Sequence, residues 1–229
     1  MRISVIIPCY NAGDYLLQAI ASIKRQKTDF PLELEIIVVD DESEDGSAKR
    51  AAAAGASVLE QKHSGPAAAR NFGWRESVGE YLLFLDADDV LSDDAIQSFS
   101  DALQRDRGAE ICLGMAKEFI SPEITANEAH RLSKKPDAFK GFFSGACFGS
   151  REAFECVGAF DEGMGSGETV EWMARLRDSE VKVTQIGSIT VYRRVHLRNT
   201  GQLRYREEMR DYAKILRRRL QARRMGNQL

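Results

Sequence analysis

The sequence predicts an α/β fold in which a mostly parallel central sheet is flanked by helices. Short apolar runs occupy residues 3–7, 34–39 and 81–85, and segments with helical spacing of apolar residues lie between them. Strands that alternate with helices in this order are parallel and are joined by crossovers. The runs lack polar alternation, which is typical of strands covered on both faces. Ligands bind at the carboxyl ends of such strands, so we expect functional residues directly after the runs.

The first half contains four predicted helices. Apolar side chains recur every three or four residues between Tyr15 and Ile23. Gly55 is a typical residue after a helix end, Pro66 suits a first helical turn, and Ser92 can cap a helix start. The helices are therefore expected at 15–23, 47–54, 66–74 and 92–103, with a further weak strand at 58–59.

The second half is less regular. Residues 111–120 predict one or two strands, and 181–186 and 190–192 predict two more. Short helices are expected at 151–156 and 168–177, and the polar segment 121–136 is expected to be a loop. We interpret 1–203 as one domain, with halves at 1–115 and 116–203, followed by a tail at 204–229.

The tail predicts a basic amphipathic helix. Residues 204–224 include nine basic and three acidic side chains, a net charge of +6. Tyr205, Met209, Tyr212, Leu216 and Leu220 fall on one helical face. Such a helix can pack on its own domain or on a second copy of the chain. It can equally lie on an anionic membrane surface, and both interpretations stay open.

The composition is that of an ordinary globular protein. Of the 229 residues, 43% are hydrophobic and 29% are charged, close to average usage. The net charge of −3 argues against a nucleic-acid partner, because such proteins usually carry a basic excess. No stretch approaches the roughly 20 apolar residues of a membrane span, and no signal peptide is recognised. We therefore expect a cytoplasmic protein, with docking on the membrane face as an alternative.

The cysteines predict neither disulfides nor a zinc site. Cys9, Cys112, Cys147 and Cys156 form no CxxC pair and lie in apolar surroundings. We expect buried free thiols. With only three histidines in the chain, a cysteine/histidine zinc site is not expected.

Three aspartates follow the run at 81–85 and give the sharpest chemical signal. Asp86, Asp88 and Asp89 lie so close in sequence that their carboxylates repel one another unless a cation lies between them. Oxygen ligands of this kind favour Mg²⁺ or Mn²⁺. The alternative is a solvated turn in which Asp89 only caps the following helix.

Two further polar groups are expected at the same edge. Asp40 and Asp41 end the second run, where a carboxylate can accept a hydrogen bond from a nucleobase N–H or a ribose hydroxyl. Arg70 lies on the helix from Pro66. Its guanidinium can bind a phosphate bidentately, or it can neutralise Asp86 or Asp40.

Together these motifs resemble the family-two glycosyltransferases, which have the Rossmann-like GT-A fold. The resemblance covers roughly residues 1–199. Four N-terminal motifs occur in order, and no one of them is specific alone. The matching segments are residues 4–11 (SVIIPCYN), 39–45, 65–71, 85–89, 158–162 and 167–168.

The resemblance implies a nucleotide-sugar donor, usually a uridine diphosphate sugar, and a metal. The nucleotide would be held by Pro8, Tyr10, Asn11, Asp40 or Asp41, and Arg70, with Asp86 near the ribose. Asp88, together with Asp89, would hold the Mn²⁺ or Mg²⁺ that bridges the diphosphate. From the late segment 192–199, His196 would reach the metal or the diphosphate, and Arg194 would help to neutralise the leaving group.

Two residues depart from the family pattern. Glu42 stands where relatives usually have glycine. Thr169 stands where relatives usually have the aspartate that acts as general base. Glu168 or Glu171 would have to replace it; the two are three residues apart and share a helical face, and Glu168 is our first choice.

The resemblance implies a one-step displacement that inverts the anomeric centre, with a sugar, a lipid-linked glycan or a peptide as acceptor. Two alternatives remain. Thr169 motivates a non-catalytic module that only binds sugar nucleotides. Residues 86–90 also resemble the nucleophile loop of haloacid-dehalogenase-type phosphatases, but that loop belongs on a first strand and here it follows the fourth.

Overall fold

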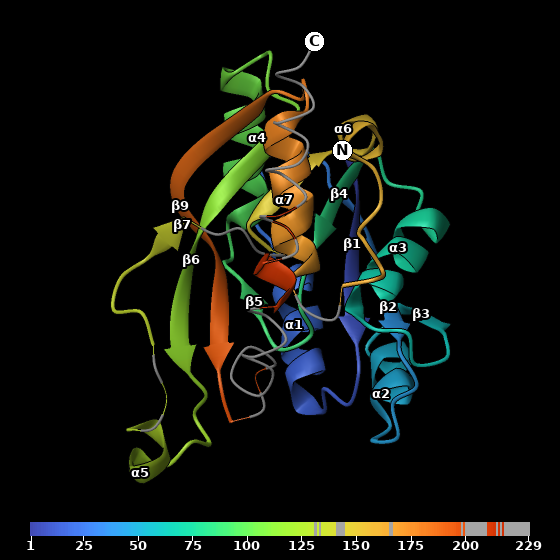
Figure 1. Ribbon diagram of the computed structural model, residues 1–229, viewed down its shortest axis with the longest axis vertical. Coiled ribbons are helices and arrows are strands. Elements are labelled where there is room, and N and C mark those ends of the chain that lie inside the picture. Colours follow the sequence, from blue (N-terminus) through green and yellow to red (C-terminus); the bar gives the residue numbers. More distant parts are fainter. Residues whose placement is uncertain are drawn as a thin grey trace.

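The computed structural model describes residues 1–130, 132, 134–140, 145–164, 167–197, 199, 210–213, 215 and 217. Within them the chain forms one nine-stranded sheet with helices on both faces (Figure 1). The strand order is β3-β2-β1-β4-β8-β6-β9-β5, and β7 pairs with β6. The fold class expected from the sequence is confirmed. Most of the predicted tail lies outside the described residues.

The N-terminal part of the sheet is parallel, as predicted. β1 (Arg2–Cys9) pairs in parallel with β2 (Glu33–Asp40) and β4 (Tyr81–Phe84), and β2 pairs with β3 (Ser57–Glu60). The connecting helices are α1 (Asp14–Lys24), α2 (Ser47–Ala53) and α3 (Pro66–Glu76). All four strands therefore end at one edge, where the acidic residues follow them.

The other part of the sheet is mixed. β8 (Cys147–Ser150) runs antiparallel to β4 and to β6 (Ile111–Ile120). β9 (Val183–Val195) is parallel to β6 and antiparallel to β5 (Val90–Leu91). β7 (Phe139–Lys140) is antiparallel to β6. β9 is one continuous strand where the sequence predicted two; the interruption appears as register shifts against β6 between Leu113 and Ala116.

The remaining helices complete the layers. They are α4 (Ala95–Arg105), α5 (Ala126–Ala129), α6 (Arg151–Val157) and α7 (Glu168–Asp178). The short α5 lies in the segment predicted as a loop. Thr125 and Glu128 form a reciprocal capping box at its start, which stabilises a helix too short to be read from apolar spacing.

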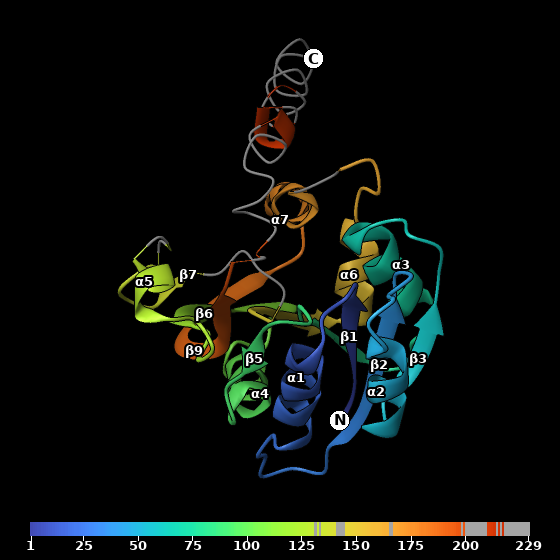
Figure 2. The ribbon, with the colours of Figure 1, turned by 90° about the horizontal axis from the view of Figure 1, so that it is seen from below.

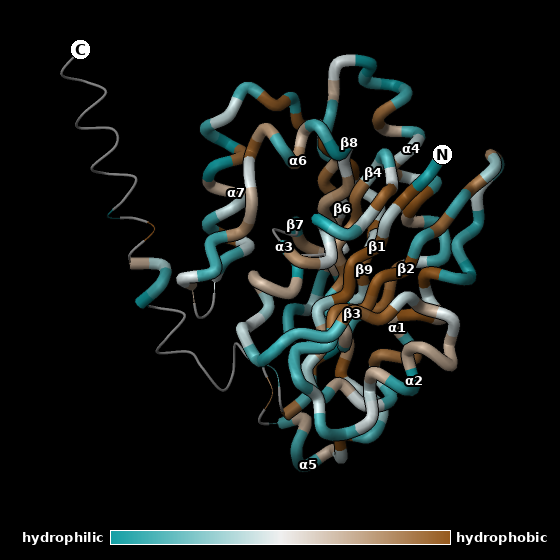
Figure 3. Tube along the Cα trace, turned by 90° about the vertical axis from the view of Figure 1, so that its right-hand side faces the viewer, coloured by the Kyte–Doolittle hydropathy of each residue, from teal (hydrophilic) through white to brown (hydrophobic). Residues whose placement is uncertain are grey.

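Two apolar layers explain why the strand runs do not alternate. Val5 and Ile7 of β1 face the layer that contains α1, α2 and α4, whereas Ile6 faces the layer with α3, α6 and α7. Figure 2 shows these two groups of helices on opposite sides of the sheet, and in Figure 3 the central strands are the most hydrophobic part of the trace. Among the described residues, no helix is long and apolar enough to cross a membrane.

Three of the four cysteines are buried as expected. Cys9, Cys112 and Cys147 are buried free thiols, but Cys156 is exposed, which corrects the prediction for that residue. Cys156 lies on α6, whose inward positions are taken by Ala153, Phe154 and Val157. Burial raises the pKa of Cys9 to about 11 and that of Cys112 to about 12.

Gly73 is required where α3 approaches the sheet. A Cβ there would lie 2.6 Å from Ile6 Cγ2 and 2.9 Å from Val39 Cγ2. We expect Gly73→Ala to lower the free energy of unfolding by about 1–2 kcal/mol, because overpacking of about 1–3 kcal/mol exceeds a helix-propensity gain of about 1 kcal/mol. Denaturant titration measures this change. Gly187→Ala is the control, since among the described residues, its chain neighbours aside, no heavy atom lies within 4 Å of its Cβ position. Equal stability of the two variants would contradict this packing.

Thiol reactivity tests the burial pattern. With Ellman's reagent at neutral pH, we expect one thiol, Cys156, to react quickly in the native protein. The other three should react only after unfolding, because they are buried and their raised pKa values keep them protonated. Cys156→Ser should abolish the fast phase. Two or more fast thiols in the native wild type would refute the arrangement.

Candidate active site

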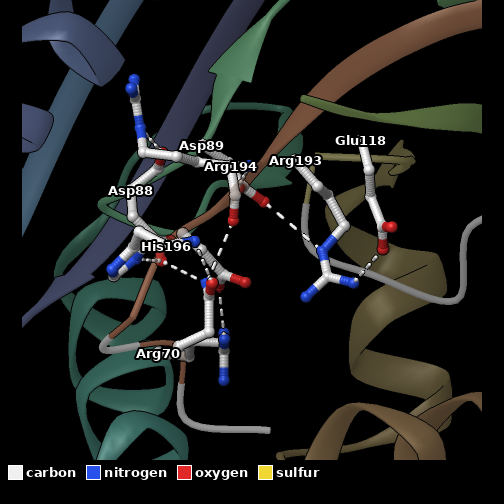
Figure 4. A network of polar contacts seen from close by, with 9 residues as sticks. Arg70, Asp88, Asp89, Glu118, Arg193, Arg194 and His196 are labelled. Atoms are coloured by element: carbon white, nitrogen blue, oxygen red, sulfur yellow. Dashed lines mark hydrogen bonds and ion pairs between the residues drawn. The ribbon is translucent and has the colours of Figure 1, made fainter. Parts of the chain in front are cut away.

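An acidic loop, Asp86 to Asp89, joins β4 to β5 at the carboxyl edge of the sheet. β9 holds this loop through Arg194. The Arg194 backbone N–H donates to Asp89 Oδ1 at 2.9 Å, and its Nε donates to the Asp88 carbonyl at 2.8 Å. Figure 4 shows Asp88 and Asp89 gathered against Arg194 and His196. The loop is thus fixed by backbone as well as side-chain contacts.

Asp89 carries an unsatisfied buried oxygen. Its side chain is buried, and within the described residues Oδ2 accepts no hydrogen bond; the Arg193 Nε is 3.9 Å away. Burial, followed by repulsion from Asp88 and Asp86, raises the pKa of Asp89 well above its usual range. Three carboxylates held together in this way favour a bound cation.

His196 is brought to the acidic loop, although 108 residues separate it from Asp88. Its Nε2 lies 3.0 Å from Asp88 Oδ2, and Asn199 Nδ2 approaches the same oxygen at 3.4 Å. The Tyr15 ring packs on the imidazole with a centroid distance of 5.0 Å. Asp88 and His196, both expected at the metal from the resemblance, therefore lie in contact.

Arg194 is buried, and its guanidinium is engaged by protein groups. Besides the Asp88 carbonyl, it donates to Ser121 Oγ at 3.0 Å and to Gln18 Oε1 at 2.7 Å. The rings of Tyr15 and Phe119 lie 4.5 and 4.7 Å from its central carbon. This residue supports the acidic loop from the side of α1 and β6.

The neighbouring Arg193 points to the other side of β9. Its guanidinium lies between Asp89 and Glu118, with Nη1 3.5 Å from Glu118 Oε1 (Figure 4). Glu118 Oε2 in turn accepts the backbone N–H of Lys135 at 2.7 Å. The acidic loop is therefore linked through two side chains to the segment that follows α5.

Arg70 joins the two halves of the chain. It is buried, and its Nη1 donates to Glu168 Oε1 at 2.6 Å while its Nη2 donates to Asp86 Oδ1 at 2.7 Å. The two carboxylates raise the pKa of Arg70 although burial opposes this, so the guanidinium stays charged. The predicted ion pair of Arg70 with Asp86 is present, and Glu168 rather than Asp40 supplies the second carboxylate bound to this guanidinium.

The two candidate bases differ sharply. Glu168 is buried and tied through Arg70 to the acidic loop, whereas Glu171 forms an ion pair with Arg175 one turn further along α7 at 2.9 Å. Arg175 also donates to the carbonyls of Val157 and Ala159, which fixes Glu171 to the α6 side. Thr169 lines a small apolar cavity with Phe84, Cys147, Phe154, Phe160, Trp172 and Met173, beside Arg70.

Predicted donor-site residues connect the ends of β1 and β2 through hydrogen bonds. Asn11 adopts a positive φ of 50°; its N–H donates to Ser43 Oγ at 2.9 Å and its Oδ1 accepts the N–H of Glu44 at 2.9 Å. Pro8 lies within β1 opposite Val39. Asp40 Oδ2 accepts the N–H of Ser43 at 3.0 Å. Within the described residues its buried Oδ1 has no hydrogen-bond partner.

Asp41 and Glu42 organise the turn that leads into α3. Asp41 accepts the N–H groups of Ser64 and Gly65 at 2.8 and 2.9 Å and the amide of Gln61 at 2.7 Å. Glu42 has φ of 69°, a conformation that glycine adopts most readily. Glycine would therefore suit this position, as the resemblance implies.

His63 is a residue that sequence reasoning missed. Its ring packs against Tyr10 with centroids 4.4 Å apart, and its Nδ1 lies 3.0 Å from Asp41 Oδ2. Tyr10 is 54% exposed, the highest value among the large hydrophobic side chains of the described residues. The signal was the polar turn between β3 and α3, which follows a third strand end of the same sheet.

Comparison with known proteins identifies the family. The model of the family described as "Glycosyl transferase family 2" matches residues 4–158. Glycosyltransferase GlyG of Streptococcus pneumoniae is 34% identical over 118 residues, which cover 49% of this chain and 38% of GlyG. The poly(ribitol-phosphate) beta-N-acetylglucosaminyltransferase TarS of Staphylococcus aureus is 34% identical over 104 residues, which cover 42% of this chain and 18% of TarS. These alignments span less than two fifths of either relative.

Solved structures confirm the fold. TarS residues 1–349 in complex with UDP align with a TM-score of 0.64 at 20% identity, covering 85% of this chain and 60% of that one. The mannosyltransferase PcManGT of Pyrobaculum calidifontis, in complex with GDP-Man and Mn²⁺, aligns with a TM-score of 0.66 at 21% identity, covering 94% and 64%. Because the family match covers most of this chain and the fold agrees with it, the chain belongs to glycosyl transferase family 2.

Proposed function

We propose that this chain transfers a sugar from a nucleoside diphosphate sugar to an acceptor hydroxyl, with inversion at the anomeric carbon. The observation that carries the proposal is the linkage of Asp86 to Glu168 through Arg70, at 2.7 and 2.6 Å. It joins a carboxylate of the acidic loop with a carboxylate on the opposite half of the chain. A donor and an acceptor bound on either side of this linkage would meet.

The nucleotide end of the donor is proposed to lie over the ends of β1 and β2. Asp40 Oδ1 is a buried acceptor without a hydrogen bond in the described residues, and a nucleobase N–H would satisfy it. The exposed Tyr10 ring offers a stacking surface. Pro8, Asn11 and Asp41 shape the backbone around them. TarS with UDP-GlcNAc and PcManGT with GDP-Man are family precedents for such donors.

We propose Mn²⁺ or Mg²⁺ as the cofactor, held by Asp88 with Asp89 and His196. The unsatisfied Asp89 oxygen and the oxygen-rich donor set fit a hard divalent ion. Within the described ranges no group of three or more His, Cys, Asp or Glu is arranged for a metal, so diphosphate oxygens and water would complete the coordination. When bound, such an ion stabilises negative charge on the departing diphosphate. Arg194 would act on the leaving group by supporting the acidic loop.

Glu168 is the proposed general base. It accepts a hydrogen bond from Arg70 through Oε1, which fixes the direction of its carboxylate. Proton transfer requires the acceptor hydroxyl within about 3 Å of the carboxylate. Glu171 is less suited, because Arg175 holds its two oxygens at 2.9 and 3.0 Å.

The acceptor is proposed to be a glycan, a lipid-linked glycan or a peptide. TarS, whose name specifies poly(ribitol-phosphate), and the minor teichoic acid biosynthesis protein GgaA of Bacillus subtilis favour a cell-surface glycopolymer as acceptor class. Contact of the basic 204–224 segment with a membrane face or with a second copy, and a cytoplasmic location, stay part of this proposal.

A non-catalytic sugar-nucleotide binding module is the second candidate. Thr169 at the usual base position and the engagement of Glu168 by Arg70 favour it. It would bind the donor in the presence of the metal, but it would neither transfer the sugar nor hydrolyse the donor.

Donor turnover with matched variants tests the function. We expect Mn²⁺ to strengthen UDP binding to the wild type in calorimetry, and Asp88→Asn to abolish this metal effect because it removes a charged ligand. Glu168→Gln should retain UDP binding. It should lower the rate of sugar transfer, or of the slow hydrolysis of the donor, by about 10²–10⁴-fold. Glu171→Gln is the control and should keep most of the activity. Turnover that survives Glu168→Gln but not Glu171→Gln would reverse the assignment, and wild-type binding without turnover would support the module.

Arg70→Met tests the buried ion pairs independently of activity. Leaving two carboxylates without their buried partner should lower the free energy of unfolding by about 3–5 kcal/mol. The control Arg25→Gln breaks the exposed pair with Asp93, and its thermal midpoint should stay close to that of the wild type. If both variants unfold at the wild-type midpoint, Arg70 does not join the two halves.

A further inference from the structure

His63 lies at the third strand end of the carboxyl edge. β1 and β3 flank β2 in the sheet, so the residues after these three strands are neighbours. Tyr10 follows β1, Asp41 follows β2 and His63 follows β3. The structure brings these three side chains into one cluster, which is separate from the acidic loop.

Asp41 fixes the imidazole of His63. The Nδ1 atom lies 3.0 Å from Asp41 Oδ2 and 3.2 Å from the Asp41 carbonyl oxygen. Both partners are acceptors only, so Nδ1 must carry the hydrogen. In the neutral ring Nε2 is then an acceptor, on the side of the ring away from Asp41. The backbone N–H of His63 also donates to Glu42 Oε2 at 3.2 Å, which anchors the turn.

The ring is held but not enclosed. The His63 side chain is 49% exposed, and its contact with the exposed Tyr10 ring is tilted by 42°. Asp41 fixes the tautomer and the orientation of this histidine from one side, and the other side of the ring is open. The imidazole is therefore preorganised to bind a ligand. Asp40 Oδ1, the unsatisfied acceptor next in sequence to Asp41, lies at the same strand end.

We propose that His63 is a specificity-determining residue for the nucleobase of the donor. The inference rests on the proposed function. The Tyr10 ring, packed against His63, forms the aromatic surface on which the base stacks, and His63 Nε2 hydrogen-bonds to the edge of the base. Stacking is tolerant of base identity, whereas the ring nitrogen distinguishes one base edge from another.

Two variants separate these contributions. His63→Phe keeps an aromatic ring against Tyr10 but removes the nitrogens, and His63→Ala removes both. We measure binding of UDP, GDP, CDP and ADP by calorimetry with Mn²⁺ present. The wild type should prefer one of the four. His63→Phe should weaken binding of that nucleotide about tenfold, which corresponds to the loss of one hydrogen bond to the base, and should level the preference. His63→Ala should also weaken binding of the other three nucleotides.

The controls keep the failure of this inference distinct from the failure of the proposed function. His130→Ala changes a histidine at the end of α5 and should bind all four nucleotides as the wild type does. Thermal midpoints near that of the wild type show that the variants are folded. If both His63 variants keep the wild-type affinities and preference, His63 does not read the base, although the donor site stands. If the wild type binds none of the four, the proposed function itself is overturned.

Discussion

A single buried cation, the Arg70 guanidinium, connects the two halves of this molecule. It comes from α3 in the N-terminal half, and it pairs with Asp86 after β4 and with Glu168 at the start of α7. Arg70 and Glu168 are buried and Asp86 is partly exposed. Removing the two buried charges from water is costly, and the cost is offset only while they stay paired. The linkage therefore fixes the position of α7 relative to the acidic loop. The proposed roles of Asp86 on the donor and of Glu168 on the acceptor depend on that position.

The acidic loop is held between two arginines. Arg70 binds its first carboxylate, while Arg194 binds the backbone of Asp88 and the side chain of Asp89. Held in this way, the carboxylates cannot separate to relieve their repulsion, and burial leaves an Asp89 oxygen without a hydrogen bond in the described residues. The fold thus maintains a repulsion between carboxylates that, together with burial, raises the pKa of Asp89. A divalent ion, which we propose as the cofactor, would relieve it.

Local patterns predicted the parallel half of the sheet because its strands are short apolar runs that end at acidic residues. Local patterns were wrong where pairing between distant segments determines the structure. β9 continues through Gly187 because β6 pairs with it on both sides of the register shifts.

For the site, the motifs identified the acidic loop and its partner His196. Helical spacing alone allowed either Glu168 or Glu171 as the base, and the position in the family motif made Glu168 the first choice. Their different arginine partners, Arg70 and Arg175, could not be predicted from the sequence. His63 was missed because its partners Tyr10 and Asp41 are distant in sequence.

A double-mutant cycle on turnover tests the central linkage most directly. Arg70→Lys keeps the buried charge but cannot bridge two carboxylates with the same geometry, and it is combined with Glu168→Gln. If Arg70 acts on catalysis by orienting Glu168, the double variant should turn over the donor no more slowly than Glu168→Gln alone. If the two losses multiply instead, Arg70 and Glu168 act independently, and the linkage is not what brings the two halves of the site together.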